Sequence, residues 1–361
     1  MKYYIISGEN SGDLYGSHLI DSIRKIDNNS IFYCWGGPYI KSRNVEVIRG
    51  LDKLSFMGFY EVFKNIFTVL YNLRLIKKEL RLKRPNCIIL IDYPGFNLKV
   101  AKYANDLRIP VFWFVAPQTW AWKESRVKLL EKYVNRLYVI LPFEKKYFSS
   151  NNINTEYFGH PLLEIINKSP INPIDRKKII LLCPGSRKQE IKSMLPTMLK
   201  VINHFRDYKF IISGAKNIEL TFYKKYINNQ DVQVIYNKNY ELMKSASAAI
   251  VASGTVTLEL ALHKVPQVVC YKTSLITYII AKKLVKIKFI SLVNLLLNNH
   301  VVDELIQNQF TLDNLILSLE KTLNKSNIEN TINEYNKLES KLNSRLIFDK
   351  ISESIFLQLK K

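Results

Sequence analysis

Short apolar runs alternate with longer stretches of helical periodicity from the first residues onward. Apolar runs of four or five residues, bounded by turn residues, are typical of strands that are buried on both faces of a parallel sheet. The first set of such runs is Tyr3 to Ile6, Cys87 to Ile91, Val111 to Val115 and Leu137 to Ile140. Because the segments between them suit helical crossovers, this part of the chain is predicted to form a doubly wound α/β unit.

The same rhythm begins again after Pro161. The second set of runs is Ile179 to Leu182, Phe210 to Ser213, Val232 to Ile235, Ala248 to Ala252 and Gln267 to Cys270. The turn at Gly159, His160 and Pro161 and the polar stretch 167–175 form the candidate linker. After Asn308 the pattern is mostly helical.

We therefore predict two doubly wound, Rossmann-like domains that face each other across a cleft, followed by closing C-terminal helices. The expected divisions are residues 1–165, 166–335 and 336–361, with the last segment packing back on the first domain. Ligands are expected beyond the carboxyl ends of the strands, where loops of such sheets gather.

The chain is strongly basic, with 53 Lys and Arg against 31 Asp and Glu in 361 residues, a formal charge of +22. Such an excess attracts polyanions, anionic membranes or phosphorylated substrates. A general bias toward Lys, Ile and Asn explains it equally well. The charge is spread along the chain without a recognisable RNA- or DNA-binding module, which argues against a nucleic-acid partner.

Three features indicate a cytoplasmic protein without a membrane span. The four cysteines lie far apart, mostly in apolar runs, and are expected to be reduced core residues: Cys34, Cys87, Cys183 and Cys270. The first apolar run is too short for a secretory signal. The most apolar stretch, 275–297, is interrupted by four lysines, which would be costly at the centre of a bilayer.

The first candidate ligand loop runs from Ser7 to Asp13, a glycine-flanked turn between a strand and a helix. Its backbone N–H groups could meet a phosphate or a sugar. The turn lacks the G-x-G-x-x-G and G-K-[ST] patterns, which disfavours a nicotinamide cofactor or a P-loop nucleotide. A tight turn capped by Ser11 or Asp13 is the structural alternative.

Asp92 directly follows the strand CIILI and precedes a Tyr-Pro-Gly turn. A carboxylate at this strand end would be partly desolvated, as a general base for a sugar hydroxyl requires. An aspartate before a Pro-Gly turn is also a common cap, and local spacing leaves both interpretations open.

Two further strand ends lie in the second half of the chain. Arg187 follows the run ending at Cys183 and could clamp a diphosphate through paired hydrogen bonds, unless it is merely an exposed arginine. Ser253, Gly254 and Thr255 open a helix, where N–H donors and the helix dipole favour a diphosphate. Glu259 lies one turn later and could accept hydrogen bonds from both ribose hydroxyls. An ordinary helix cap would look similar.

The segment from Met57 to Arg84 combines apolar residues at helical spacing with a basic end. This pattern fits an interfacial helix on an anionic membrane, and equally a helix packed on the sheet with a solvated basic end. No metal site is predicted, because the five histidines are isolated and no D-x-D pair occurs.

At these residues the sequence resembles the lipid-A-disaccharide synthase family, from the first strand to about Leu305. The resembling blocks are SGENSGDLYG, GGP at 36–38, LSFMGFYEV, IDYPGFN, VAPQTWAWKESRV, LPFEK, FGHPL, PGSRKQEI, ASGTVTLE and ISLVNLL. The family is similar in fold to two-domain glycosyltransferases of the GT-B type, in which the first domain receives the acceptor and the second the nucleotide-sugar. Many relatives carry an acidic residue where this chain has Gly95, so a second carboxylate role at that position is in doubt.

The resemblance implies transfer of 2,3-diacylglucosamine from UDP to 2,3-diacylglucosamine 1-phosphate (lipid X), by a single inverting displacement without a cofactor or metal. It implies that Asp92 is the base for the acceptor 6-hydroxyl, with Glu9 and Ser11 on the catalytic side and Met57 on the acceptor side. The residues that it assigns to the donor and its UDP are Arg187, Ser253, Gly254, Thr255, Glu259 and Asn294.

The resemblance also implies a peripheral enzyme on the cytoplasmic face of the inner membrane of a Gram-negative bacterium, and it strengthens the membrane interpretation of Met57 to Arg84. The oligomeric state stays open. The nearest rivals are a UDP-N-acetylglucosamine epimerase and an undecaprenyl-linked transferase. The blocks around Trp120, Trp122 and Phe143 argue against both.

Overall fold

The computed structural model describes residues 1–54, 66–121, 124–167, 176–227, 231–284, 287–342 and 345–360. The chain divides into two compact units, unit 1 with Met1–Glu164 and Leu342–Lys361, and unit 2 with Ile165–Lys341. Met57, the start of the segment 57–84, Trp122 and most of the proposed linker 167–175 lie outside the described residues.

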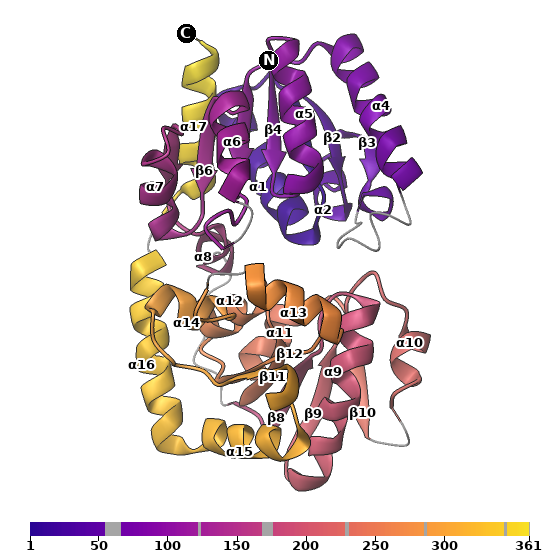
Figure 1. Ribbon diagram of the computed structural model, residues 1–361, viewed down its shortest axis with the longest axis vertical. Helices are drawn as coiled ribbons and strands as arrows, with labels where there is room; N and C mark the ends of the chain where they lie inside the picture. The colour runs from indigo at the N-terminus through magenta and orange to yellow at the C-terminus, as the bar shows by residue number, and fades with distance from the viewer. Residues whose placement is uncertain are drawn as a thin grey trace. The chain divides into compact units, whose positions relative to one another are not determined.

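Unit 1 is built on a parallel sheet of seven strands in the order β3-β2-β1-β4-β5-β6-β7 (Figure 1). The strands are β1 (Lys2–Ser7), β2 (Ile31–Gly36), β3 (Glu46–Gly50), β4 (Cys87–Ile91), β5 (Val111–Phe114), β6 (Arg136–Val139) and β7 (Thr155–Tyr157). Four of them coincide with the predicted apolar runs, and β2, β3 and β7 were not predicted. The strand order that steps outward on both sides of β1 and β4 confirms the doubly wound α/β class.

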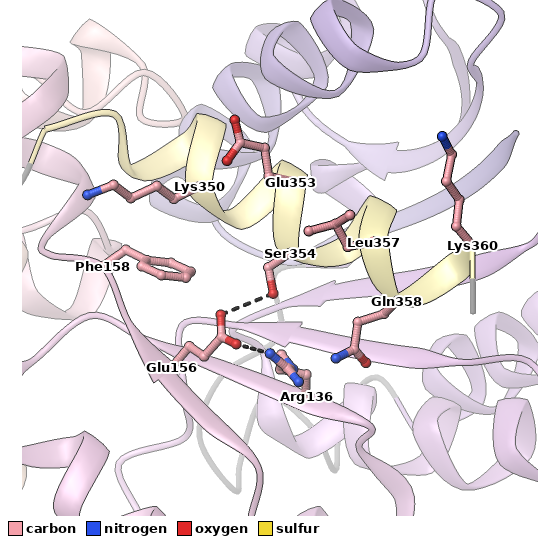
Figure 2. A pocket seen from close by; sticks show the side chains of 9 residues that line it. All are labelled: Arg136, Glu156, Phe158, Lys350, Glu353, Ser354, Leu357, Gln358 and Lys360. Carbon is pink, nitrogen blue, oxygen red and sulfur yellow. Dashed lines mark hydrogen bonds and ion pairs between the residues drawn. The ribbon is translucent and has the colours of Figure 1, made fainter.

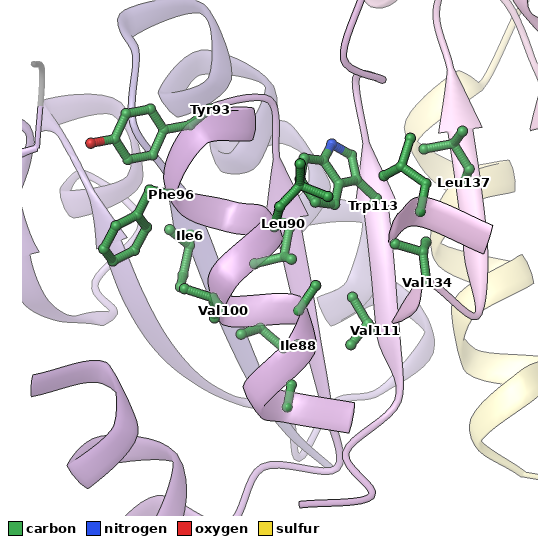
Figure 3. Packing of buried hydrophobic residues seen from close by; sticks show 14 of the residues in the cluster. Ile6, Ile88, Leu90, Tyr93, Phe96, Val100, Val111, Trp113, Val134 and Leu137 are labelled. Atoms are coloured by element: carbon green, nitrogen blue, oxygen red, sulfur yellow. The ribbon is translucent and has the colours of Figure 1, made fainter. Parts of the chain in front are cut away.

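Helices connect the strands of unit 1: α1 (Asn10–Ile26), α2 (Pro38–Lys41), α4 (Ile66–Lys83), α5 (Pro94–Asp106), α6 (Val127–Tyr133) and α7 (Pro142–Ser149), with 3-10 turns η1 (Leu51–Lys53) and η2 (Glu124–Arg126). Figure 3 shows α5 on one face of the sheet, where Phe96 and Val100 pack over Ile88 and Leu90 of β4. These side chains are almost fully buried. Burial stabilises each by about 1.5–3 kcal/mol, which fixes the sheet beneath the loops that follow its strands.

Unit 2 repeats the plan with six parallel strands in the order β10-β9-β8-β11-β12-β13. The strands are β8 (Ile179–Cys183), β9 (Lys209–Ser213), β10 (Val232–Ile235), β11 (Ala248–Ala252), β12 (Gln267–Tyr271) and β13 (Glu304–Ile306). The helices and 3-10 turns are α9 (Lys188–Lys200), η3 (Val201–His204), α10 (Leu220–Lys224), α11 (Asn239–Ser245), α12 (Thr255–Leu262), α13 (Leu275–Leu284), α14 (Leu292–Leu297), η4 (Gln307–Gln309) and α15 (Leu312–Leu323). Five strands match the predicted runs, and the short β13 was not predicted.

Two helices, α8 (Pro161–Asn167) and α16 (Lys325–Leu342), carry the chain between the units. At the start of α8, Gly159 has a φ of 119°, a conformation that favours glycine. The next residue, His160, is fully buried, its Nδ1 accepts a hydrogen bond from the Leu162 N–H at 3.3 Å, and burial lowers its pKa to about 3. His160 is therefore a neutral structural residue of this turn.

Helix α17 (Ile347–Leu359) follows unit 2 in sequence but packs on unit 1. Glu164 Oε2 accepts hydrogen bonds from the first N–H groups of α17, those of Ile347 at 2.6 Å and Phe348 at 3.2 Å. The Phe348 ring stacks on His18 with centroids 5.2 Å apart, and Lys25 pairs with Asp349 at 2.9 Å. A closing helix thus completes the first unit.

A pocket of about 610 Å³ lies where α17 meets β6 and β7 (Figure 2). Its floor holds an ion pair between Arg136 and Glu156, and Ser354 Oγ donates to Glu156 Oε2 at 3.0 Å. Arg136 begins β6, so the pocket lies along the helix rather than at the carboxyl ends of the strands. We regard it as a seam between α17 and the sheet.

The structure bears on two sequence-based predictions, the state of the cysteines and the presence of a membrane span. The four cysteines are buried free thiols, as the apolar runs predicted. Among the described residues, no helix has both the length and the apolar character needed to cross a bilayer.

Candidate active site

Four neighbouring strands of unit 1, β1, β4, β5 and β6, end at one edge of the sheet. In a parallel sheet the loops after adjacent strands lie side by side. Glu9 follows β1, Asp92 follows β4, and the segments 115–121 and 140–144 follow β5 and β6. The topology therefore gathers these groups at one edge, as the strand-end argument predicted for Glu9 and Asp92.

The backbone at Asp92 turns sharply to present its side chain. Asp92 and Tyr93 have φ values of 49° and 52°, in the left-handed region that costs a bulky residue on the order of 1–3 kcal/mol. Three hydrogen bonds hold this turn. Asp92 N–H donates to the Phe114 carbonyl at 3.0 Å, Asn97 Nδ2 donates to the Asp92 carbonyl at 2.7 Å, and Tyr93 Oη donates to the Leu54 carbonyl at 2.6 Å. Strain held in this way is typical of functional sites.

The environment of the Asp92 carboxyl makes it an unusually strong base. Burial raises its pKa most, and the nearby carboxylate of Glu9 raises it further. The Tyr93 N–H opposes the shift, Glu144 adds to it, and the resulting pKa is about 8. A carboxyl with that pKa accepts a proton far more readily than an ordinary aspartate, whose pKa is about 3.9.

Glu9 occupies the position just before α1, and Ser11 lies in the first turn of that helix, partly exposed. The residue before Glu9 must be small, because a Cβ on Gly8 would overlap the Tyr93 ring. Glycine thus lets Tyr93 lie against the β1 loop, which keeps Glu9 and Asp92 on neighbouring turns.

Asp13 has a structural task that the sequence interpretation did not identify. It does not cap α1. Its fully buried carboxylate accepts hydrogen bonds from the N–H groups at the start of α2: Gly37 at 2.6 Å, Tyr39 at 2.9 Å and Ile40 at 3.2 Å. These bonds join the SGENSGD and GGP blocks, so both glycine-rich turns are fixed by one side chain.

Glu144 is a site residue that the sequence interpretation missed. It is buried in the first turn of α7, where Oε1 accepts from Trp120 Nε1 at 3.0 Å and Oε2 from Leu141 N–H at 3.0 Å. The Trp120 ring meets Phe143 edge to face, with centroids 4.9 Å apart. Burial raises the pKa of Glu144 to about 7. The only signal in the sequence was the pairing of the VAPQTW and LPFEK blocks.

In unit 2, β8 and β11 are neighbours, with Cys183 opposite Val251. The loop after β8 turns at Gly185, whose φ is 110°. Glu190 closes this loop by accepting from the Ser186 and Arg187 N–H groups at 2.9 and 3.2 Å. The Arg187 side chain contacts Glu190 at 3.2 Å and is about half exposed, so its guanidinium is held at the rim of the loop.

The neighbouring loop after β11 leads directly into α12. Ser253 is anchored, since its N–H donates to the Cys270 carbonyl at 3.0 Å and its hydroxyl to the Ile290 carbonyl at 2.7 Å. Gly254 and Thr255 are exposed at the helix N-terminus. The loop therefore offers backbone N–H groups on Gly254 and Thr255 more readily than on Ser253.

Glu259 lies on α12 near the end of β8: burial raises the pKa of Cys183 most, and the charge of Glu259 adds to that shift. Burial raises the pKa of Glu259 to about 7. Its carboxylate accepts no hydrogen bond from any residue that the structure describes. Glu259 is partly exposed, so its carboxylate, which has no donor among the described residues, can receive donors from a ligand.

Asn294 is fully buried, and both ends of its amide are engaged within unit 2. Nδ2 donates to the Val302 carbonyl at 2.8 Å and to Glu304 Oε1 at 2.9 Å, while Oδ1 accepts from Val301 and Val302 N–H at 2.8 and 3.0 Å. The side chain holds the segment after α14 in place. The structure shows no amide atom left over for a ligand.

Groups of three or more His, Cys, Asp or Glu placed to hold a metal do not occur within the described ranges. The chemistry that the residues support is proton transfer at Asp92 and anion binding at the Arg187 and α12 loops.

The chain thus consists of two doubly wound units, one with Asp92 and Glu9 at its strand ends and the other with the exposed N-terminus of α12, an architecture shared by two-domain UDP-sugar enzymes. Residues 3–355 match the family model described as lipid-A-disaccharide synthetase. The chain is 34% identical over 342 residues to the lipid-A-disaccharide synthase of Coxiella burnetii, covering 91% of this chain and 90% of that one. It is 34% identical over 318 residues to that of Syntrophus aciditrophicus, covering 84% and 83%.

The chain belongs to the lipid-A-disaccharide synthase family, and it is therefore a glycosyltransferase. Among solved structures, it is similar to the UDP-GlcNAc 2-epimerase from Neisseria meningitidis bound to UDP-GlcNAc, with a TM-score of 0.65, 14% identity and 99% of each chain covered. At that identity the similarity shows the shared fold.

Proposed function

We propose that this chain transfers 2,3-diacylglucosamine from UDP-2,3-diacylglucosamine to lipid X, forming the β-1′,6-linked disaccharide 1-phosphate and UDP. The observation that carries this proposal is the Asp92 carboxyl, half-buried at a strand end near the Glu9 carboxylate, with its pKa raised to about 8. Transfer to a hydroxyl requires a group that takes the hydroxyl proton, and a base with a pKa near the working pH performs this best.

In the proposed step, the acceptor 6-oxygen attacks C1 of the donor sugar while the C1–O bond to UDP breaks on the opposite face. The configuration at C1 inverts, and the hydroxyl proton passes to Asp92. Glu9 assists because its negative charge makes Asp92 more basic. Ser11, in the first turn of α1, is the polar group proposed to orient the acceptor on this side.

The donor is proposed to bind to unit 2. Arg187 and the N-terminus of α12 would meet the diphosphate, and they would stabilise the negative charge that develops on the leaving UDP. Glu259 would accept hydrogen bonds from the ribose hydroxyls, which supply the donors that its partly exposed carboxylate lacks within the described chain. Asn294 would act indirectly by holding the segment around Ser291, since its own amide is engaged.

Membrane association is proposed through α4. The second half of this helix packs on unit 1 through Ile76 and Leu80, whereas the first half exposes a row of apolar side chains: Ile66, Phe67, Leu70 and Tyr71. Phe67 is 82% exposed. Exposed basic residues follow on the same helix at Lys77, Lys78 and Arg81. An apolar row next to cations suits the headgroup region of an anionic bilayer, here the cytoplasmic leaflet of the inner membrane.

The decisive experiment is to incubate the purified protein with both substrates, with and without a chelator, and to follow UDP and disaccharide by mass spectrometry. Equal yields of UDP and disaccharide are expected in both conditions. UDP without disaccharide would contradict the proposal and point to hydrolase or epimerase chemistry. No turnover would contradict the substrate assignment.

A further inference from the structure

Helix α13 belongs to the segment that connects β12 to β13, and hydrogen bonds hold this segment at both ends. Where it begins, Ser193 Oγ donates to the Lys272 carbonyl at 3.0 Å, and Gln307 forms hydrogen bonds with Thr273 N–H and carbonyl at 3.0 and 2.7 Å. These contacts fix the point where the chain leaves β12.

After α13, the segment is hydrogen-bonded to the proposed donor loop. Ser253 Oγ donates to the Ile290 carbonyl at 2.7 Å, and the Glu304 carboxylate accepts from Ile290 and Ser291 N–H at 2.9 and 3.0 Å. Because Ser253 directly precedes the N-terminus of α12, these contacts hold α13 on the side of unit 2 that carries the proposed UDP site.

The helix between these fastenings exposes apolar side chains. Leu275 is 63% exposed and Ile279 is 47% exposed. Residues four apart lie on the same face of a helix, so the two side chains form one apolar patch. Because the described residues of unit 2 leave both side chains largely uncovered, this face of α13 is suited to an interface.

The charge around this patch has one sign. Lys272, Lys282, Lys283 and Lys288 are all exposed. The sequence contains no Asp or Glu from residue 260 to residue 302. Leu317 on α15 makes the contrast: it is equally exposed at 63%, but Asp313 and Glu320 flank it one turn away on either side. An exposed leucine alone therefore does not distinguish α13 from α15. The distinguishing feature of α13 is that its exposed apolar pair has only basic charged residues around it.

We propose that Leu275, Ile279, Lys282 and Lys283, the α13 surface, bind the anionic surface of a lipid bilayer. The apolar pair enters the boundary between headgroups and acyl chains, while the lysines meet anionic headgroups. With ten residues, α13 lies in the interface and does not span the bilayer. The inference rests on the proposed function, because it supplies the donor unit with a membrane contact of its own, beside the site for an acylated nucleotide-sugar.

The test is co-sedimentation of the full chain with phosphatidylcholine vesicles, with and without phosphatidylglycerol. Leu275→Ser combined with Ile279→Ser should lower the partition coefficient more than tenfold on anionic vesicles. Lys282→Gln combined with Lys283→Gln should lower it about fivefold per lysine on anionic vesicles only, as expected for about 1 kcal/mol per basic residue at an anionic surface. Leu317→Ser is the matched control and should leave partitioning unchanged.

Three outcomes would overturn the inference. In the first, the Leu275→Ser, Ile279→Ser variant binds vesicles as well as Leu317→Ser does. In the second, the lysine changes weaken binding to neutral vesicles as much as binding to anionic vesicles. In the third, the chain binds duplex DNA in a salt-sensitive way, and only the lysine changes reduce that binding. Unchanged melting temperature and UDP affinity confirm that each variant folds. Vesicle binding needs no substrate, so it stands or falls separately from disaccharide synthesis, which is measured in detergent.

Discussion

The indole N–H of Trp120 donates a 3.0 Å hydrogen bond to Oε1 of Glu144, a buried carboxylate whose charge also reaches Asp92. This contact ties the loop after β5 to the loop after β6, and through them it shapes one side of the Asp92 site. Glu144 is thus a positioning residue with an electrostatic effect. Both roles can be separated by experiment.

The pH dependence of kcat/KM should report the raised pKa of Asp92. A general base works when it is deprotonated, so kcat/KM should rise with pH up to about 8, the pKa of Asp92, instead of levelling off above about 4 as for an ordinary aspartate. Glu9 and Glu144 are the titratable groups that raise its pKa, and the Tyr93 backbone N–H, which does not titrate, opposes them. A profile already flat from pH 5 upward would contradict this prediction.

Glu144→Gln should move that acidic limb to lower pH, because it removes a negative charge that raises the pKa of Asp92. The glutamine oxygen can still accept from Trp120, but its amide nitrogen cannot accept from the Leu141 N–H, so the melting temperature is measured beside the kinetics. Glu9→Gln should move the limb further, since Glu9 has the larger influence. A variant that merely loosened the loop would lower the rate without moving the limb, and Trp120→Phe serves as that control.

Asp92→Asn should lower turnover by about 10²-fold or more with UDP affinity nearly intact. Asparagine has the size of aspartate but cannot take the acceptor proton. Steady-state kinetics and calorimetric titration with UDP measure the two effects. A rate close to that of the unmodified enzyme would remove Asp92 from the role of base.

Glu259→Ala should weaken UDP binding about tenfold or more, as expected for loss of hydrogen bonds to a charged group worth about 1.5–3 kcal/mol. Glu241→Ala, at an exposed glutamate of α11, is the matched control and should leave the affinity unchanged. Equal UDP affinities of the two variants would exclude the ribose role.

Phe67→Ser combined with Leu70→Ser should reduce sedimentation with anionic vesicles and leave the melting temperature unchanged, because both side chains are exposed. Leu357→Ser, an exposed leucine on α17, is the control. A drop in melting temperature with unchanged sedimentation would instead support packing of α4 against the protein.

Substitution by alanine should destabilise the protein at one glycine near Asp92 and be tolerated at another. A Cβ at Gly8 would overlap the Tyr93 ring, so Gly8→Ala should destabilise by about 1–3 kcal/mol and lower activity. A Cβ at Gly95 would meet nothing within 4 Å, so Gly95→Ala should be tolerated. Thermal unfolding and kinetics measure both, and equal effects would contradict this account of Gly8.

The sequence was sufficient to predict the strands that are buried on both faces, because each is a continuous apolar run. The short strands β7 and β13, with three residues each, and the partly exposed edge strand β3 carry no such run. The apolar run of β2 (Ile31–Gly36) was a usable signal that was overlooked.

In the candidate site, too, features set by strand order could be predicted from the sequence, whereas contacts between residues distant in sequence could not. The convergence of Glu9 and Asp92 follows from strand order, which a sequence pattern can suggest. The bond between Trp120 and Glu144 depends on how two loops pack, and no spacing encodes it. The engagement of Asn294 by Val302 and Glu304 was likewise invisible, since its partners belong to a later loop and strand.

Because α17 comes last in the chain, unit 1 cannot complete its fold until the end of synthesis. Unit 1 is assembled from Met1–Glu164 and Leu342–Lys361, so the ribosome must translate all of unit 2 before α17 becomes available. At about 5–20 residues per second, the nascent first unit waits on the order of ten to forty seconds with the side that receives Phe348 uncovered. During that interval the apolar side is accessible to chaperones. Unit 1 can complete its fold only when α17 has been synthesised and packs on it.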